Sequence, residues 1–181
     1  MTSAMKSVKE KQAQAFETMK GEFGYTAKLA APRLVKVVVS ATTGRSKDKN
    51  RNEMVMGRLA KITGQKPSLR AAKKSIAAFK LREGDKIGVA VTLRGARMVG
   101  FLDKFFNVAI PRTRDFRGYE KKSVDEMGNL TLGVKEQSIF PETTDEEIKD
   151  LFGLAVTIVT TAKNKKEATR FFELIGTPFK K

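Results

Sequence analysis

Two short runs of positive charge contain the side chains with the clearest potential for chemistry. Residues 68–85 hold five lysines and arginines together with Phe79, and residues 111–122 hold five around Phe116 and Tyr119. Lys and Arg side chains neutralise phosphates and release counterions, while exposed aromatic rings stack on unpaired bases. The two runs therefore predict a polyanionic partner, with nucleic acid as the leading class.

Positive charge dominates the whole chain and is concentrated around these two runs. The 181 residues carry a net charge of +16, and residues 61–122 alone hold 16 Lys or Arg against 5 Asp or Glu. A single charged run is as often a solvated face as a binding surface, but here two runs flank the same predicted strand and helix. That arrangement favours a folded unit from which two cationic arms project.

An anionic membrane surface is the competing partner for so basic a chain. A membrane-bound helix needs a broad apolar face opposite its lysines, whereas the first predicted helix has only small apolar residues beside Lys6, Lys9 and Lys11. No apolar run approaches the roughly 18 residues that span a bilayer, and the first residues lack the apolar stretch of a signal peptide. We therefore expect a cytoplasmic protein and rank the membrane interpretation low.

The composition removes the usual catalytic groups. There is no Cys and no His, which excludes thiolate nucleophiles, zinc–thiolate sites and the commonest general base. Residues 44–47 lack the spacing of a phosphate-binding loop. The carboxylates of residues 125–150 are far more typical of a solvated acidic patch than of an acid–base pair. The sequence thus predicts a non-catalytic protein with no cofactor and no metal site.

Hydrophobic periodicity predicts the elements that must position the two arms. Apolar residues at helical spacing predict helices over residues 3–20, 49–63 and 98–109; the acidic segment 142–150 is expected to be a short helix, and a cap signal predicts another over 164–175. Alternating or β-branched runs predict four strands, over residues 33–40, 86–94, 129–134 and 154–161. Residues 68–85 bury too little to form a core element, and we expect a projecting loop or hairpin tip there. Asn164 and Glu167 have the spacing of a capping box.

The order of these elements indicates the fold class. Strands and helices are mixed without strict strand–helix–strand alternation, which favours an α+β, two-layer domain with a mainly antiparallel sheet. We expect the helices to pack on one side of that sheet and the basic loops to project from it. No internal repeat or low-complexity linker divides the chain, so residues 1–181 are expected to form a single domain.

Some residues near the predicted basic surface have two roles open to them. Phe79 is equally consistent with an exposed stacking ring and with an anchor that fixes its loop in the core. Ser40, Gln65 and Thr92 sit at predicted strand ends, where satisfying a turn is the commoner role of a polar side chain. The stripe from Met98 to Phe106, in contrast, is expected to be core.

Several longer motifs, taken together, are specific. They are ITGQKP (residues 62–67), KKSIAAFK (73–80), VTLRGARM (91–98), IPRTRDFRG (110–118), GVKEQSIFPE (133–142), IVTTAK (158–163) and the final PF (178–179). In this order, and from APR at residues 31–33 onward, they resemble bacterial ribosomal protein five of the large subunit. The resemblance covers nearly the whole chain.

The resemblance implies a structural protein that binds 5S ribosomal RNA and helps attach it in the central protuberance. It further implies contact with large-subunit rRNA, with neighbouring large-subunit proteins and with P-site tRNA. It also implies an intersubunit bridge to small-subunit ribosomal protein thirteen. The fold implied is an antiparallel sheet with helices packed on one side.

Residues carry over by their positions in the motifs. The implied rRNA-binding residues are Arg33, Ser40, Arg45, Gln65, Lys66, Thr92 and Arg94. The loop that would approach tRNA holds Lys73, Lys74, Ser75, Ala77, Phe79 and Lys80. The bridge would use Arg112, Arg114, Phe116 and Arg117, or the acidic region that follows them.

One loop departs from the family pattern. After the first strand the family has an Asn and a Gly-rich turn, whereas this chain has Ser40 and then ATTG at residues 41–44. Ser40 keeps a hydroxyl but reaches less far than Asn, and Thr42 stands in place of a glycine. The cations Arg45, Lys47, Lys49 and Arg51 are expected to compensate through phosphate contacts.

A free-standing basic RNA chaperone or regulator is the alternative function. It would use the same charged surface without entering the ribosome. Co-sedimentation with large subunits distinguishes the two, because a free regulator would stay in the soluble fraction.

Overall fold

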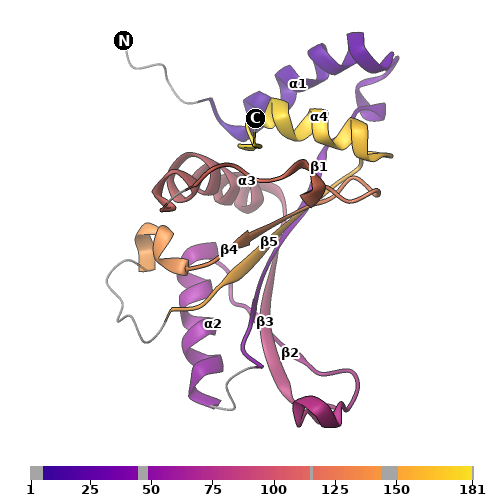
Figure 1. Ribbon diagram of the computed structural model, residues 1–181. Coiled ribbons are helices and arrows are strands. Elements are labelled where there is room, and N and C mark those ends of the chain that lie inside the picture. The colour runs from indigo at the N-terminus through magenta and orange to yellow at the C-terminus, as the bar shows by residue number, and fades with distance from the viewer. Residues whose placement is uncertain (1–5, 45–48, 115, 144–150, 181) are drawn as a thin grey trace. The chain divides into compact units, whose positions relative to one another are not determined.

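The computed structural model describes residues 6–44, 49–114, 116–143 and 151–180. Within these ranges the helices are α1 (Val8–Phe23), α2 (Lys49–Thr63), α3 (Gly95–Lys104) and α4 (Lys165–Ile175). The strands are β1 (Leu34–Thr42), β2 (Ser68–Ala71), β3 (Lys86–Leu93), β4 (Leu130–Val134) and β5 (Leu154–Thr160). They join one antiparallel sheet in the order β2-β3-β1-β5-β4 (Figure 1), which confirms the predicted α+β class. None of the described helices combines the length and apolarity of a membrane span.

The chain divides into two compact units. The helical unit contains residues 1–37, 94–132 and 157–181, and the hairpin unit contains residues 38–93 and 133–156. Strands β1, β4 and β5 contribute residues to both. The expectation that the whole chain behaves as a single domain stays a prediction.

The helical unit is built around phenylalanines. Helix α1 packs against α4 and α3, and Phe101, Phe105, Phe171 and Phe172 are at most 3% exposed. The ring centroids of Phe101 and Phe105 are 5.9 Å apart in a stacked pair. The predicted apolar stripe on the third helix is therefore confirmed as core.

Helix α1 begins and ends a few residues later than the sequence predicted. It begins after Ser7, whose hydroxyl accepts from the Glu10 N–H while the Glu10 carboxylate accepts from the Ser7 N–H. This reciprocal capping box satisfies two of the unpaired donors of the first turn. Gly21 lies inside the helix, and Gly24 in the left-handed conformation ends it.

The third helix does not run regularly to Pro111 as expected. Helix α3 ends at Lys104 and continues as a π-turn (Phe105–Ala109) and a 3₁₀ turn (Ile110–Arg112). The π-turn closes with a hydrogen bond from the Ile110 N–H to the Phe105 carbonyl. Pro111 is tolerated because it lies at the start of the 3₁₀ turn, where a missing N–H costs little.

The hairpin unit pairs α2 with the strands beside it. Helix α2 has the predicted bounds and packs against β3, burying Val55, Leu59 and Ile62. It ends where the Gly64 N–H donates to the Ala60 carbonyl (2.8 Å).

Strand β2 corrects the prediction of an irregular segment at residues 68–85. Residues Ser68–Ala71 pair with β3 in antiparallel register, with Ser68 opposite Ala90. The strand was not recognised because SLRA has no β-branched residue, so its extended form depends on pairing with β3. The remainder, residues 72–85, is the hairpin tip that the sequence predicted.

Two further predictions concern the last third of the chain. The acidic helix expected at residues 142–150 falls almost entirely outside the described residues, of which Pro141–Thr143 form a 3₁₀ turn. The cap of α4 is confirmed, since Asn164 Oδ1 accepts from the Glu167 N–H (2.9 Å).

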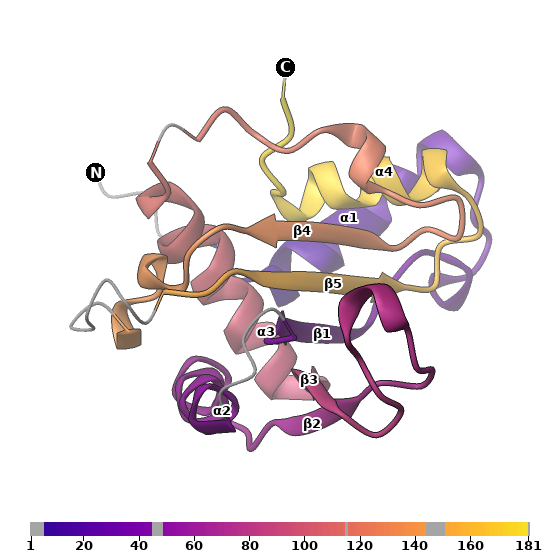
Figure 2. The same ribbon diagram turned by 60° about the horizontal axis from the view of Figure 1, so that its bottom comes forward.

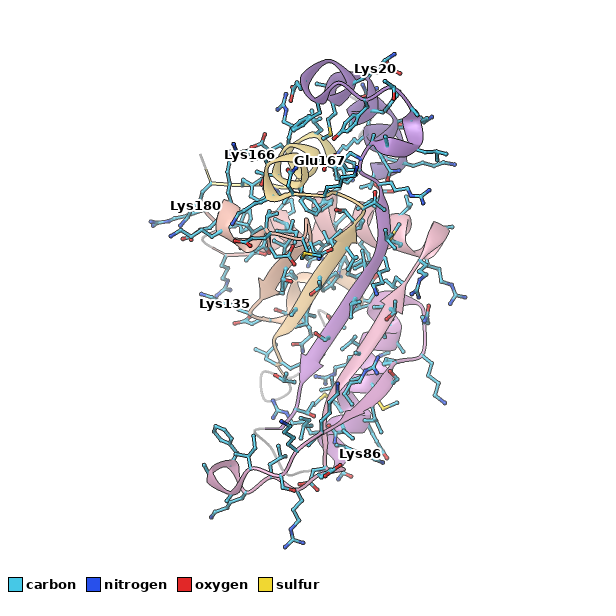
Figure 3. The ribbon with its side chains drawn as sticks, turned by 90° about the vertical axis from the view of Figure 1, so that its right-hand side faces the viewer. Lys20, Lys86, Lys135, Lys166, Glu167 and Lys180 are labelled. Atoms are coloured by element: carbon cyan, nitrogen blue, oxygen red, sulfur yellow. The ribbon has the colours of Figure 1, made fainter. Side chains whose placement is uncertain are left out.

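The expected capping box is only half formed at this cap. The carboxylate of the buried Glu167, which is labelled in Figure 3, accepts from the Lys163 N–H (2.8 Å) and from the Tyr25 hydroxyl, instead of from the Asn164 N–H. Burial and this hydrogen bond raise the pKa of Tyr25. Glu167 therefore ties the end of α1 to the start of α4.

Candidate nucleic-acid interface

The strands of the hairpin unit have one buried and one open face. On β1, Val39 and Ala41 are buried, whereas Ser40 is half-buried and Thr42 is exposed. Because side chains alternate along a strand, the same division continues across the paired strands. The face opposite the buried one, here called the open face, carries Val38, Ser40, Thr42, Ser68, Arg70, Gly88, Ala90 and Thr92, of which Gly88 and Ala90 are themselves buried. Figure 3 looks onto these strands with α2 behind them.

Most side chains of the open face are small, and one position on β3 has none. A Cβ atom on Gly88 would lie 3.1 Å from the Ala41 carbonyl oxygen and 4.0 Å from Arg70 Cβ. Glycine therefore lets β1 and β2 approach β3 without a side chain standing up between them. A broad polyanion can reach backbone and hydroxyl groups across such a surface, while Arg70 supplies a charge beside them.

The structure brings together four of the predicted rRNA-binding residues in the hairpin unit. Gln65 Nε2 donates to the Thr92 carbonyl (3.2 Å), which fixes the loop after α2 against β3. This is the backbone-satisfying role that residue type alone favours. Ser40 and Thr92 lie on the open face, and the neighbouring Lys66 is exposed.

The other predicted rRNA-binding residues belong to the helical unit or lie outside the described residues. Arg33 and Arg94 are exposed residues of the helical unit. The Arg33 backbone pairs with Thr161, donating to its hydroxyl (3.0 Å) and accepting from its N–H (3.0 Å). Arg45 lies outside the described residues.

The sequence placed Arg70 in the first cationic run but did not group it, or Ser68, with the predicted rRNA-binding residues. Both face the open side because Ser68 is opposite Ala90 and Arg70 is opposite Gly88. The available signal was the polar–apolar–polar alternation around Leu69, which is too short to identify a strand by itself.

The loop that departs from the family pattern is tied down where it leaves β1. The Thr43 N–H donates to the Ile87 carbonyl (2.9 Å), and its hydroxyl donates to Asn52 Oδ1. Arg51, one of the expected compensating cations, donates to the Leu151 carbonyl (3.5 Å) beside a hollow of about 650 Å³ that Ser40 and Thr42 also line. Arg45, Lys47 and the side chain of Lys49 lie outside the described residues.

The hairpin tip, residues 72–85, is the first arm. Its base closes with hydrogen bonds from the Ala72 N–H to the Asp85 carbonyl (2.8 Å) and from the Gly84 N–H to the Ala72 carbonyl (3.0 Å). Further out, Ile76 and Leu81 form an antiparallel bridge with bonds of 3.0 and 3.1 Å. The first arm is thus a hairpin closed at its base and again at the Ile76–Leu81 bridge, beyond which Ala77–Phe79 form a 3₁₀ turn.

The end of the first arm is fully presented to solvent. Phe79 is 76% exposed, so of its two open roles the anchor in the core is excluded. Lys80 has a φ of 50°, a left-handed conformation that residues with a Cβ rarely adopt. The remaining predicted tRNA-loop residues, all exposed, are Lys73, Lys74, Ser75 and Ala77.

The second arm, residues 111–122, makes contacts with other parts of the helical unit. The Phe116 and Tyr119 rings meet edge to face with centroids 5.1 Å apart, and burial raises the pKa of the Tyr119 hydroxyl. Both residues are half-buried, so their rings are less available for stacking on bases than the ring of Phe79. Lys121 Nζ lies 2.7 Å from Glu173 Oε1, and this hydrogen bond lowers the pKa of Glu173. The residues predicted for the bridge include three exposed arginines, Arg112, Arg114 and Arg117.

Comparison with known proteins finds similarity over nearly the whole chain. A family model described as ribosomal protein L5 matches residues 28–82, and a second model, for the C-terminus of the same ribosomal family, matches residues 86–179. A large ribosomal subunit protein uL5 from Heliobacterium modesticaldum is 50% identical over 178 residues, covering 97% of this chain and 99% of its own length. The chain belongs to the ribosomal protein L5 family. The L5 protein of Desulfatibacillum aliphaticivorans is 52% identical over 161 residues, 88% of this chain and 90% of that protein.

Membership of the L5 family confirms the resemblance seen in the motifs. Proteins of this family are structural, non-enzymatic components of the ribosome, as the absence of His and Cys led us to expect. The predicted location, the cytoplasmic ribosome, is confirmed on the same basis. The open face and the two arms are therefore surfaces of an L5-family protein.

Proposed function

We propose that this L5 chain is a structural protein of the large ribosomal subunit that binds 5S rRNA and helps attach it in the central protuberance. The observation that carries the proposal is the open face of the hairpin unit, where the hydroxyl side chains of Ser40, Thr42, Ser68 and Thr92 lie on the same side of the strands as Arg70. Structured RNA is recognised mostly by its shape, its phosphates and its 2′-hydroxyls, and this face offers donors for such contacts.

The two arms are assigned to other partners. The first arm approaches P-site tRNA, since its exposed lysines and Phe79 suit phosphates and an unpaired base. The second arm makes the contact with small-subunit ribosomal protein thirteen. Its rings are engaged within the arm, which leaves arginines on a shaped surface that suits a protein partner.

A gel shift with 5S rRNA in the presence of excess bulk tRNA tests the 5S proposal. The shift is expected to survive the competitor. If about 6 phosphates are neutralised, the affinity should fall roughly a thousandfold between 50 and 200 mM salt. Loss of the shift on competition would mean that charge alone causes binding, and the free-regulator hypothesis would then be the better one.

A matched pair of variants shows whether the open face is responsible. Arg70→Ala removes the cation opposite Gly88 and should weaken 5S binding, lowering the salt slope by about one. Arg82→Ala removes an exposed cation of the same charge from the first arm and should leave 5S binding nearly unchanged. Equal losses in both variants would contradict a specific role for the open face.

A further inference from the structure

Residues 177–180 lie directly against the second arm. Tyr119 and Phe179 form a parallel bridge in which the Tyr119 N–H donates to the Pro178 carbonyl (2.8 Å) and the Lys180 N–H donates to the Tyr119 carbonyl (2.8 Å). Figure 2 shows this last segment of the chain crossing the arm. Both strands of the bridge belong to the helical unit. We call residues 177–180 the clasp.

Gly118 permits this close approach. It has a φ of 90°, and a Cβ atom there would lie 2.7 Å from the Lys180 nitrogen and 2.9 Å from the Phe179 carbonyl carbon. A side chain at this position would meet backbone, which cannot move aside as the end of a flexible side chain can. The arm is therefore shaped to receive the clasp.

The clasp is in turn fixed to the core. Helix α4 ends at Gly176 in the left-handed conformation, and the Thr177 N–H donates back to the Phe172 carbonyl (3.0 Å). Phe172 and Thr177 are both buried. Two solvent-exposed ion pairs, Lys121–Glu173 (2.7 Å) and Lys180–Glu120 (3.7 Å), flank the bridge.

We propose that the clasp is the positioning element of the second arm. By holding Tyr119, it supports the edge-to-face contact with Phe116 and so sets how the arginines of the arm are presented. An arm ordered before binding loses less conformational entropy when its partner docks. This inference rests on the proposed contact between the second arm and a small-subunit protein. The clasp itself is not among the residues proposed to touch that partner; its role is to hold the arm in shape.

Limited trypsin digestion of the free protein tests the clasp without reference to any partner. Gly118→Ala should clash with the clasp and speed cleavage within residues 112–122 by about tenfold, the effect of losing one or two backbone hydrogen bonds. Gly24→Ala is the control, because Gly24 also has a left-handed φ of 69° but nothing lies within 4 Å of its Cβ position. Equal cleavage of the two variants would overturn the proposal.

A second pair of variants separates backbone from side chain. Lys180→Pro removes the N–H that donates to Tyr119, whereas Lys180→Ala keeps that N–H and removes only the ion pair with Glu120. Lys180→Pro should match Gly118→Ala, and Lys180→Ala should match the native protein. The unchanged thermal transition of the core would show that the protein has folded; equal digestion of the two Lys180 variants would contradict the role given to the backbone bridge.

Association of reconstituted large subunits with small subunits links the clasp to the contact. Replacing Arg112, Arg114 and Arg117 with Ala should weaken association if the second arm makes the protein contact. Gly118→Ala should then weaken it in the same direction, with Gly24→Ala unaffected. If the arginine variant has no effect, the proposed contact fails; if it has an effect and Gly118→Ala has none, the clasp proposal fails.

Discussion

The two cationic arms have similar compositions and different constructions. The first contains four Lys or Arg and the second five, and each has at least one aromatic ring. The first arm presents Phe79, which is 76% exposed, on a hairpin closed by backbone hydrogen bonds and by the side chains of Ser75 and Asp85. In the second arm Tyr119 is held between Phe116 and the clasp.

The difference shows that composition does not determine how a charged segment is used. A ring that is exposed on a narrow hairpin is available to stack on a base, and its neighbouring cations can adjust to a flexible polyanion. A ring that is packed against its own chain instead shapes the surface around it, as a protein contact requires. Substitutions in the first arm should therefore weaken tRNA binding, whereas substitutions in the second arm should lower stability.

The largest expected effect comes from removing charge from the first arm. Replacing Lys73, Lys74 and Lys80 with Ala should lower the affinity of ribosomes for P-site tRNA by at least about tenfold near physiological salt, because three phosphate contacts are lost. Binding of 5S rRNA by the free protein should stay nearly intact. Filter binding of tRNA and the 5S gel shift measure the two, and loss of 5S binding in this variant would contradict the separation of the surfaces.

A smaller effect is expected from exchanging the aromatic residues for alanine. Phe79→Ala should weaken tRNA binding roughly tenfold, since base stacking contributes about 1–3 kcal/mol. It should change the free energy of unfolding by less than about 0.5 kcal/mol because the ring is exposed. Tyr119→Ala should do the reverse, lowering the free energy of unfolding by about 1–2 kcal/mol with tRNA binding unchanged. Urea denaturation and filter binding of both variants would show whether the contrast between the arms is real.

The smallest effect is a pH dependence of the ion pairs that Glu173 of α4 forms with Lys121 of the second arm and with Arg170. The hydrogen bond from Lys121 lowers the pKa of Glu173 below its ordinary value of 4.5. The ionised carboxylate therefore stabilises the folded protein above pH 4.5, and this contribution is lost as the pH falls through the lowered value. Glu173→Gln should flatten the change in the urea midpoint between about pH 5 and pH 3, measured by circular dichroism. Glu120→Gln is the control, because its longer, exposed pair with Lys180 contributes less.

Local pattern was enough to predict most elements of the fold. Helix α2 was predicted with the correct bounds because Val55, Leu59 and Ile62 share one face and Gly64 follows them. Strand β3 was recognised from strict alternation, and the Asn164 cap of α4 from its side chain. In each case the deciding residues lie within a few positions of one another.

Features that depend on distant partners were not predictable in this way. Strand β2 is extended because it pairs with β3, and the docking of Tyr119 depends on Phe179, sixty residues further along the chain. The exposure of Phe79 depends on what surrounds the hairpin tip, about which its neighbours in sequence say little. Ser68 and Arg70 were likewise missing from the sequence-based site, since they join the open face only through the register of the sheet.

At Lys80 the requirements of folding stability and of the proposed tRNA contact differ. Its left-handed backbone costs about 1–2 kcal/mol in a residue with a Cβ, and glycine would occupy that position without strain. Local folding energy alone would therefore favour glycine at the end of the first arm. An engineer who optimised the isolated chain for thermal stability would be drawn to Lys80→Gly, and would remove one of the cations that the proposed tRNA contact needs.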